Sequence, residues 1–439
     1  MTSHKILRRS IVGLVLVGSW FAANIEAAPQ GRDDSASEET GTATVAQKTD
    51  TVRSRSITER VLLNMRSPIG FSMGIFEMYA PNSGDSTLKG DKSPVFTMMR
   101  PRLFANAKTK NSQFQFDYTF GFKRYNRRSE IHSSEHSARL DYDYRLSRNA
   151  TLQISDTFRS AFNDYGALPI STSPTLYQPS FAQELYLPHE RATTNSVLTG
   201  IHYRAGKRSN LTVFGSYDTW RYQSSTFANA QGFQVGIRAD HQINKFLFLN
   251  SSYSHYLTAV DPRFEAASIH RLQLGGLKFK FRRNMEIYFS GGADYTRFQG
   301  TQEPAASYQA GFSKGSGSTL FSAVYHRGLS AAVGPQATVN GHVVSISLTQ
   351  WLTRRVDLQI NSAYTRGASL KNNSRIEYLG GTAELQIQLQ QHVLFSVQSQ
   401  YVSQRGTNLP SETPLLSRYT VTSGIQFIFA SLGGRRGER

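Results

Sequence analysis

The sequence predicts an all-β protein: a transmembrane, antiparallel, up-and-down β-barrel of about eighteen strands, with sixteen as the lower bound. Three observations predict it. Segment after segment alternates apolar and polar side chains, which is the two-residue period of a strand. The links between the segments alternate between short and longer. After residue 30 no apolar run approaches the ~20 residues of a membrane helix, whereas an alternating barrel strand keeps its mean hydropathy low.

The alternating pattern begins near Phe71 and ends at Phe429. The expected strands are 71–80, 95–107, 113–125, 133–146, 151–162, 195–205, 210–222, 232–243, 246–257, 267–281, 285–298, 305–314, 319–329, 338–351, 355–366, 375–389, 392–403 and 417–429. Every second link is short, as at Asn244-Lys245 and Gln390-Gln391, and the longest link runs from Asn163 to Thr194. Short turns at one end and longer loops at the other are typical of membrane barrels with an even number of strands.

Each expected strand has one apolar and one polar face. In the segment 113–125 one face is wholly aromatic from Phe114 to Phe122, and the other carries Gln113, Asp117 and Lys123. An apolar face suits lipid, and a polar face with charges of both signs suits a water-filled lumen, because a buried unpaired charge is costly. The residues expected to line the lumen are Arg139, Asp141, Asp143, Arg145, Arg238, Asp240 and Asp357.

The last strand indicates a cellular location for the predicted barrel. Thr422–Phe429 resembles the C-terminal sorting signal of bacterial outer-membrane β-barrels, with Gly424, Phe427 and Phe429 at the fixed positions. That class usually ends on the aromatic residue, whereas here Ala430–Arg439 follow. The resemblance implies insertion into the outer membrane by the barrel-assembly machinery, with short periplasmic turns and longer outer loops. It reaches the porin-like class and no specific family.

The N-terminal residues read as a secretory signal peptide over 1–27, with a basic start (Lys5, Arg8, Arg9) and an apolar core. Residues 28–57 are polar and predict a disordered periplasmic segment. Residues 58–70 predict a short helix or a lead-in to the barrel, which spans 71–429, and 430–439 form a C-terminal tail. The chain has no cysteine, which excludes a lipobox, a disulfide and a thiolate metal site.

The formal net charge of +18 favours anionic binding partners. Basic proteins often bind nucleic acid, but an exported barrel does not meet it. We therefore expect outer-membrane lipid, including lipopolysaccharide, and anionic solutes or glycans as partners. The sequence does not specify an oligomeric state.

No motif for chemistry emerges from the sequence. His255, His270 and His326 lie in three expected strands without metal-ligand spacing. A serine beside a histidine, as in Ser254-His255, points to the opposite face of its strand. Glycine pairs such as Gly275-Gly276 fall inside strands, where they let a barrel bend. We expect no enzyme, no cofactor and no metal.

The long link Asn163–Thr194 is the strongest functional candidate in the sequence, because long ordered loops are usually functional. Its aromatic residues are Tyr165, Tyr177, Phe181 and Tyr186. The loop either folds into the lumen as a constriction, stacks its aromatics on sugar rings, or caps the barrel from outside.

Two expected strands are irregular. Pro101 cannot donate a ladder hydrogen bond and predicts a bulge or a register break. Lys278 and Lys280 alternate with apolar residues near a turn, where lysines at a membrane interface extend their ammonium groups to water.

The function expected from these features is a porin-like channel that passes hydrophilic solutes across the outer membrane. One alternative is an outer-membrane port for polysaccharide export that works with periplasmic machinery. The other is a structural or adhesive barrel with a plugged lumen.

Overall fold

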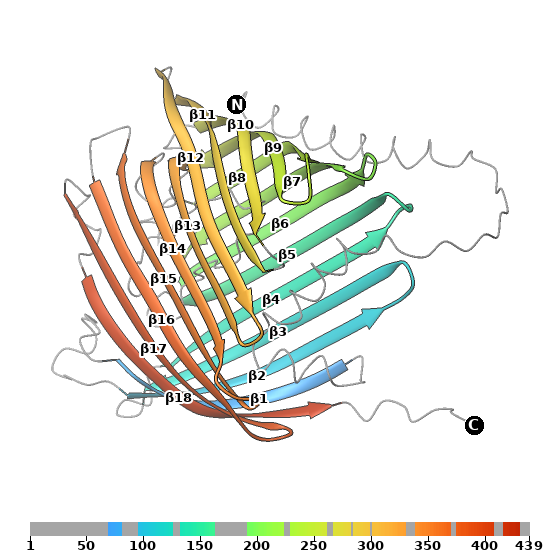
Figure 1. The fold of residues 1–439 in the computed structure, drawn as a ribbon. Coiled ribbons are helices and arrows are strands. Elements are labelled where there is room, and N and C mark those ends of the chain that lie inside the picture. The colour runs from blue at the N-terminus through green and yellow to red at the C-terminus, as the bar shows by residue number, and fades with distance from the viewer. Residues whose placement is uncertain are drawn as a thin grey trace, which may run out of the picture. The chain divides into compact units, whose positions relative to one another are not determined.

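The computed structural model describes residues 69–80, 95–125, 132–162, 191–223, 229–260, 267–281, 284–298, 301–330, 339–369, 375–407 and 416–430. Eighteen antiparallel strands form one sheet (Figure 1). They are β1 (Ile69–Tyr79), β2 (Val95–Lys108), β3 (Ser112–Tyr125), β4 (His132–Arg145), β5 (Ala150–Phe162), β6 (Arg191–Arg204), β7 (Ser209–Tyr222), β8 (Ala230–Gln242), β9 (Leu247–Val260), β10 (Ala267–Phe281), β11 (Met285–Phe298), β12 (Thr301–Ser316), β13 (Thr319–Ser330), β14 (Val339–Trp351), β15 (Val356–Ser369), β16 (Arg375–Gln390), β17 (Val393–Thr407) and β18 (Leu416–Ala430).

The sheet closes on itself into a barrel. β18 pairs with β1 from Val421 opposite Tyr79 to Ala430 opposite Gly70, and every other pairing joins strands that are consecutive in sequence. The predicted fold class is therefore confirmed. Each of the eighteen expected segments is a strand, and the largest differences, four residues, occur where β6 and β12 begin and where β17 ends.

The two ends of the barrel differ in their links. Residues 109–111, 146–149, 205–208, 243–246, 317–318, 352–355 and 391–392 form short turns at one end, here called the turn end, and the link from β10 to β11 at this end is three residues long. The opposite end is the loop end, where one link departs from the expected length: β11 and β12 are joined by residues 299–300 alone. Gly206, in the turn after β6, has a φ of 132°, which favours glycine.

The outward face of the wall is apolar. Large hydrophobic side chains alternate along the strands with their exposed faces turned away from the lumen, among them Phe71 and Phe429, whose rings stack across the closing seam at 6.2 Å. Others in this set are Ile75, Leu103, Val213, Ile237, Leu274, Phe289, Ile346, Ile360, Leu379 and Ile425. A free monomer in water rarely exposes so large an apolar surface, so lipid contact accounts for it best.

A bulge in β10 exchanges its two faces. The pairing of β10 with β9 and with β11 shifts around Gly275-Gly276. Leu272 and Leu274 face outward before the bulge, and Leu277 faces outward after it. The structure has a bulge at this glycine pair, and its consequence is that Lys278 and Lys280 face inward.

Two expectations for irregular strands are therefore wrong in detail. Lys278 does not lie at a membrane interface but pairs with Glu286 across the lumenal face, with Nζ to Oε1 at 2.6 Å. Lys280 lies over the ring of Phe248. Pro101 interrupts the ladder between β2 and β3, but the register on either side is the same, because its missing N–H removes a bond without inserting a residue.

Inward-facing aromatic rings lie over glycines of the wall. The ring of Phe214 covers Gly236, that of Tyr288 covers Gly311 and that of Tyr378 covers Gly380, so closely that a Cβ at any of these glycines would overlap the ring. An aromatic ring over a glycine shields the backbone that the missing side chain leaves exposed. These inward-facing aromatic rings therefore cover the backbone of the barrel wall.

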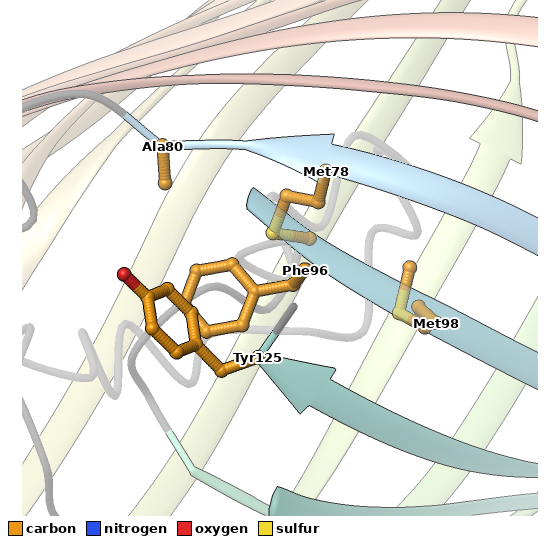
Figure 2. Close-up of a cluster of buried hydrophobic side chains, with 5 residues drawn as sticks. All are labelled: Met78, Ala80, Phe96, Met98 and Tyr125. Carbon is orange, nitrogen blue, oxygen red and sulfur yellow. The ribbon is translucent and has the colours of Figure 1, made fainter. Parts of the chain in front are cut away.

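One apolar cluster lies on the inner wall at the loop end of β1–β3 (Figure 2). Its members are Met78, Ala80, Phe96, Met98 and Tyr125, all at most 5% exposed. The rings of Phe96 and Tyr125 meet at 5.3 Å between centroids. This sector of the inner wall is therefore apolar and covered, in contrast with the charged sector described below.

Several expectations lie outside the described residues. They are the signal peptide 1–27, the segment 28–57, residues 58–68 of the expected lead-in, and 431–439 of the tail. Ile69 and Gly70, expected in the lead-in, belong to β1, and Ala430 is the last residue of β18. Within the described residues there is no helix with the length and apolar character needed to cross a membrane.

Candidate functional site: the inner wall of the barrel

All seven residues expected to line the lumen lie on the inward face. β4 carries Arg139, Asp141, Asp143 and Arg145, β8 carries Arg238 and Asp240, and β15 carries Asp357. Each alternates along its strand with an outward apolar residue, such as Leu140 on β4, Ile237 on β8 and Ile360 on β15. Their part in solute passage stays a prediction.

The β4 sector of the inner wall is accessible to solvent. Arg139 has 65% of its side chain exposed, although it faces into a closed barrel. Its Nε donates to Asp141 at 2.7 Å, and Asp141 also accepts a bond from Ser155 of β5 at 2.8 Å. An ion pair that stays exposed to solvent loses little solvation, so it changes the free energy of the folded state only slightly.

The Arg238–Asp240 pair on β8 is more sheltered. The arginine donates through Nε and Nη2 to the two carboxylate oxygens at 2.9 and 2.8 Å. Its side chain is 8% exposed and that of Asp240 is 27% exposed. Of the two pairs, Arg139–Asp141 therefore presents the more accessible charge to a passing ion.

A second charged group lies on the inward face of β2, β3 and β4, and of its members the sequence analysis named only Asp117 and Lys123. Arg102 of β2 pairs with Asp117 of β3, and Lys123 of β3 pairs with Glu135 of β4. Arg100 approaches Glu135 at 3.7 Å. The signal was present in the sequence, since these residues fall on the polar face of alternating strands, but which acid meets which base depends on the register between strands.

The strongest network of the inner wall lies at the loop end of β10–β13 and was also missed. Arg271 of β10 donates through Nε and Nη2 to the two oxygens of Asp294 of β11, both at 2.8 Å. Both side chains are buried, Asp294 completely. The same pair holds backbone groups of β13: the carbonyl oxygen of Leu329 accepts from Arg271 at 2.5 Å, and its N–H donates to Asp294 at 2.8 Å.

This network reaches across a strand. Leu329 belongs to β13, whereas Arg271 and Asp294 belong to β10 and β11, so β12 lies between them in the order of the sheet. Sequence patterns report only which face a residue occupies, so they give no sign that a strand end leaves the wall.

The histidines of the sequence have different settings. His255 and His270 face each other across β9 and β10, with their Nδ1 atoms 3.2 Å apart, but on the outward face of the barrel. His326 faces inward and is buried. Ser254 faces inward while His255 faces outward, so the two do not meet. Among the residues that the structure describes, no group of three or more potential metal ligands occurs.

Tyrosine–histidine pairs recur on the outward face. Tyr118 bonds to His136, Tyr253 to His270 and Tyr325 to His342, each between the phenol oxygen and Nδ1 at 2.8 to 2.9 Å. Exposed arginines lie on the same face near these pairs: Arg366 is directly opposite His342 and bonds to Glu377 at 3.3 Å, and Arg297 and Arg405 are exposed as well. Amphipathic rings beside basic groups are typical of a membrane–water boundary.

The remaining predicted residues separate into two groups. Tyr165, Tyr177, Phe181 and Tyr186 of the proposed constriction loop lie outside the described residues. In the sorting signal Phe427 and Phe429 face outward and are 39% and 53% exposed. Gly424 faces inward, and a Cβ there would lie 2.3 Å from the carbonyl oxygen of Ile75, so the closing seam itself requires glycine.

Comparison with known proteins finds likeness in fold only. No protein-family model matches the chain, and no curated protein matches its sequence. OccAB3 from Acinetobacter baumannii is 9% identical, with 82% of this chain and 99% of that chain covered and a TM-score of 0.40. OccK2 (OpdF) from Pseudomonas aeruginosa, solved with glucuronate, is 9% identical, with coverages of 84% and 99% and a TM-score of 0.42.

The FrpB iron transporter from Neisseria meningitidis, in its F3-3 variant, is 10% identical, with coverages of 84% and 83% and a TM-score of 0.44. At these values the likeness is to the barrel architecture alone.

Proposed function

We propose that the chain is an outer-membrane channel through which hydrophilic solutes cross. The observation that carries the proposal is the exposure of Arg139, a charged side chain that faces into a closed barrel and is 65% exposed. A barrel of eighteen strands is in the size range that leaves an aqueous interior. The outward face, with its exposed leucine, isoleucine and phenylalanine side chains, suits the hydrocarbon of a membrane.

The test is single-channel conductance of the refolded protein in a planar bilayer, with a salt gradient to measure ion selectivity. We expect a steady open conductance whose selectivity depends on the charges of the β4 sector. Heat-modifiable migration on a gel establishes that the barrel has folded. A folded barrel that passes no current would refute the channel.

A barrel with an occluded lumen is the second candidate, and one observation favours it. Inward-facing side chains at the loop end of β1–β3 are almost fully buried, including Met98 and Tyr125, each 1% exposed. An open water-filled lumen would wet them. The conductance experiment separates the two candidates, because an occluded barrel folds normally and stays silent.

A port for polysaccharide is a variant of the channel and is distinguished by what it passes. We propose swelling of protein-containing vesicles in a graded series of neutral sugars, from mono- to oligosaccharides. A small-solute channel admits the short sugars and excludes the long ones. A glycan port admits long chains, or its ion current is blocked by them.

Anionic outer-membrane lipid is the partner that we propose for the outward face. The proposal is supported by the exposed Arg297, Arg366 and Arg405, which lie near the outward Tyr–His pairs and carry the charge that phosphate groups of anionic lipid would attract. The thermal stability of the barrel in vesicles should rise when anionic lipid is added, and replacing the three arginines by glutamine should abolish that rise. An equal response of both proteins would contradict the proposal.

We propose that the end of β18 directs insertion by the barrel-assembly machinery. Phe429→Ser removes the outward aromatic ring, while the register with β1 through backbone bonds is kept. The expected result is a lower amount of folded protein in the outer membrane of cells and normal refolding of the purified variant in detergent. Failure of both would assign Phe429 to the stability of the seam instead.

A further inference from the structure

We infer that the loop end of β13 leaves its ladder with β12, lies over the inner face of β11 and β12 together with the paired end of β14 beside it, and forms a constriction of the lumen. Arg271 and Asp294 hold the end of β13 there. This inference rests on the proposed channel function where it concerns solute passage. The position of the strand ends can be tested independently of any current.

The pairing of strands shows where the wall divides. β12 pairs with β11 from Lys314 to Thr301, the end of the strand, but it pairs with β13 only from Ser316 to Tyr308, opposite Thr319 to Arg327. Beyond Tyr308 no described residue pairs with β12 on that side. β13 continues from Gly328 to Ser330 and stays paired with β14 as far as Val339. The loop end of β13 therefore departs from β12 and stays paired with β14.

Hydrogen bonds show the direction of that departure. The backbone N–H and C=O of Leu329 bind Asp294 and Arg271, whose side chains project from the inward face of β11 and β10. A bond to these groups is possible only if Leu329 lies on the lumenal side of the wall. Leu329 is 1% exposed, and Ser307 of β12, which faces inward beneath it, is fully buried.

A row of glycines lies at the point where the strands bend. Gly328 is paired with Gly341, and Gly341 is paired with Gly367 of β15, so one glycine from each of three neighbouring strands forms a line across the sheet. Glycine allows a sheet to bend sharply and allows close approach of another backbone. A Cβ at Gly328 would lie 2.6 Å from Oδ2 of Asp294 and 3.1 Å from Oγ of Ser307. A residue with a side chain would hold the strand end away from the wall.

The Arg271–Asp294 pair suits a positioning role. Burial of two charges in a wall costs several kcal/mol unless the geometry of the pair is good and its remaining hydrogen-bonding groups are used. Here the bidentate bond meets the first condition, and the two bonds to Leu329 help to meet the second. Because the pair binds backbone rather than a side chain, it fixes the location of the strand end whatever residue occupies position 329.

The first experiment measures position by labelling. The chain has no cysteine, so Leu329→Cys introduces a single thiol. In the otherwise unchanged protein the thiol is covered, and a membrane-impermeant maleimide should label it slowly. Adding Arg271→Leu and Asp294→Leu removes both charges without leaving one unpaired. We expect the labelling rate to rise about tenfold or more, because the strand end then opens to solvent.

The matched control replaces an arginine–aspartate pair that lies within a single strand. Arg238→Leu and Asp240→Leu remove the same chemical groups from the same face of the barrel. They should leave the labelling of the thiol at position 329 unchanged. An equal rise with both pairs would mean that the whole barrel had loosened, and it would overturn the assignment of the Arg271–Asp294 pair.

The second experiment measures the constriction. Gly328→Ala keeps all charges and displaces the strand end by steric overlap, and it should raise both single-channel conductance and the labelling of the introduced thiol. Gly291→Ala is its control, since a Cβ there meets nothing within 4 Å. It should leave both readouts unchanged.

The two readouts separate the possible failures. Faster labelling with unchanged conductance would place the strand ends as inferred and overturn their role as a constriction. Labelling that stays slow in both the double-leucine protein and Gly328→Ala would overturn the inference altogether. If the unaltered barrel conducts nothing, the proposed function fails, and labelling still decides where the strand ends lie.

Discussion

Arg139–Asp141 on β4 and Arg271–Asp294 across β10 and β11 join the same two side-chain types in different surroundings. The first pair lies within one strand, two residues apart, and is 65% and 31% exposed. The second joins two strands and is 8% and 0% exposed. The first pair is accessible to solvent, whereas the buried pair forms hydrogen bonds with the backbone of a third strand. An inward charge in a barrel wall thus lines the pore or organises the wall, and exposure decides which.

The largest expected effect separates the two aspartates. Asp294→Ala leaves Arg271 buried without its partner and should lower the free energy of unfolding by about 3–5 kcal/mol. Asp141→Ala, the matched change at the hydrated pair, should cost less than about 1 kcal/mol. Urea titrations of both proteins in lipid vesicles measure the two values. Equal losses would mean that exposure does not divide the pairs as described.

A somewhat smaller effect tests the faces on which the comparison depends. Ile360→Arg places a charge on the outward face of β15, where it should cost about 2–4 kcal/mol if the position lies near the membrane midplane. The neighbouring change Gln359→Arg places the same charge on the inward face and should be tolerated. The measurement is again the free energy of unfolding in vesicles. A greater loss at Gln359 would reverse the assignment of faces.

The smallest expected effect concerns ion selectivity. Arg139→Gln removes an exposed lumenal positive charge and should shift the ion selectivity toward cations by about twofold, since a unit charge some 8 Å from a passing ion is worth only about 0.5 kcal/mol in water. Arg238→Gln, at the sheltered pair, should change it less. Reversal potentials under a salt gradient measure both, and the effects should fade at high salt. A larger change from Arg238 would show that exposure is a poor guide to influence on ions.

Most of the fold was predictable because the controlling signal is local. A two-residue period of hydrophobicity defines each strand, and the alternation of short and long links defines a barrel with turns at one end. The bulge at Gly275-Gly276 was visible as a glycine pair, but its effect was not, since a single inserted residue exchanges the faces of everything after it. For this reason the sequence pattern predicts Lys278 and Lys280 at a membrane interface, whereas in the structure both lie on the inward face.

The types of residue at the candidate site were predictable from the sequence, but the contacts between those residues were not. The charged face of β4 follows directly from the alternation of Arg139, Asp141, Asp143 and Arg145. The contacts of Arg271 do not, because they join three strands and depend on register. The glycine row at Gly328, Gly341 and Gly367 spans positions that are distant in sequence, and only the pairing of the strands brings them together.

The closing seam has a consequence for how this chain comes to exist at all. Gln426 donates to Ser72 at 2.9 Å across 354 positions of sequence. One edge of β1 therefore stays unpaired until β18 joins it. Joining such distant segments costs loop-closure entropy, and this cost grows slowly with loop length. The contacts of the seam offset the cost only when the last strand has paired. A truncated chain that lacks β18 would carry two open edges in place of one seam, and open edges promote aggregation. Premature termination should therefore give no narrower barrel and no partial activity, only material for proteolysis.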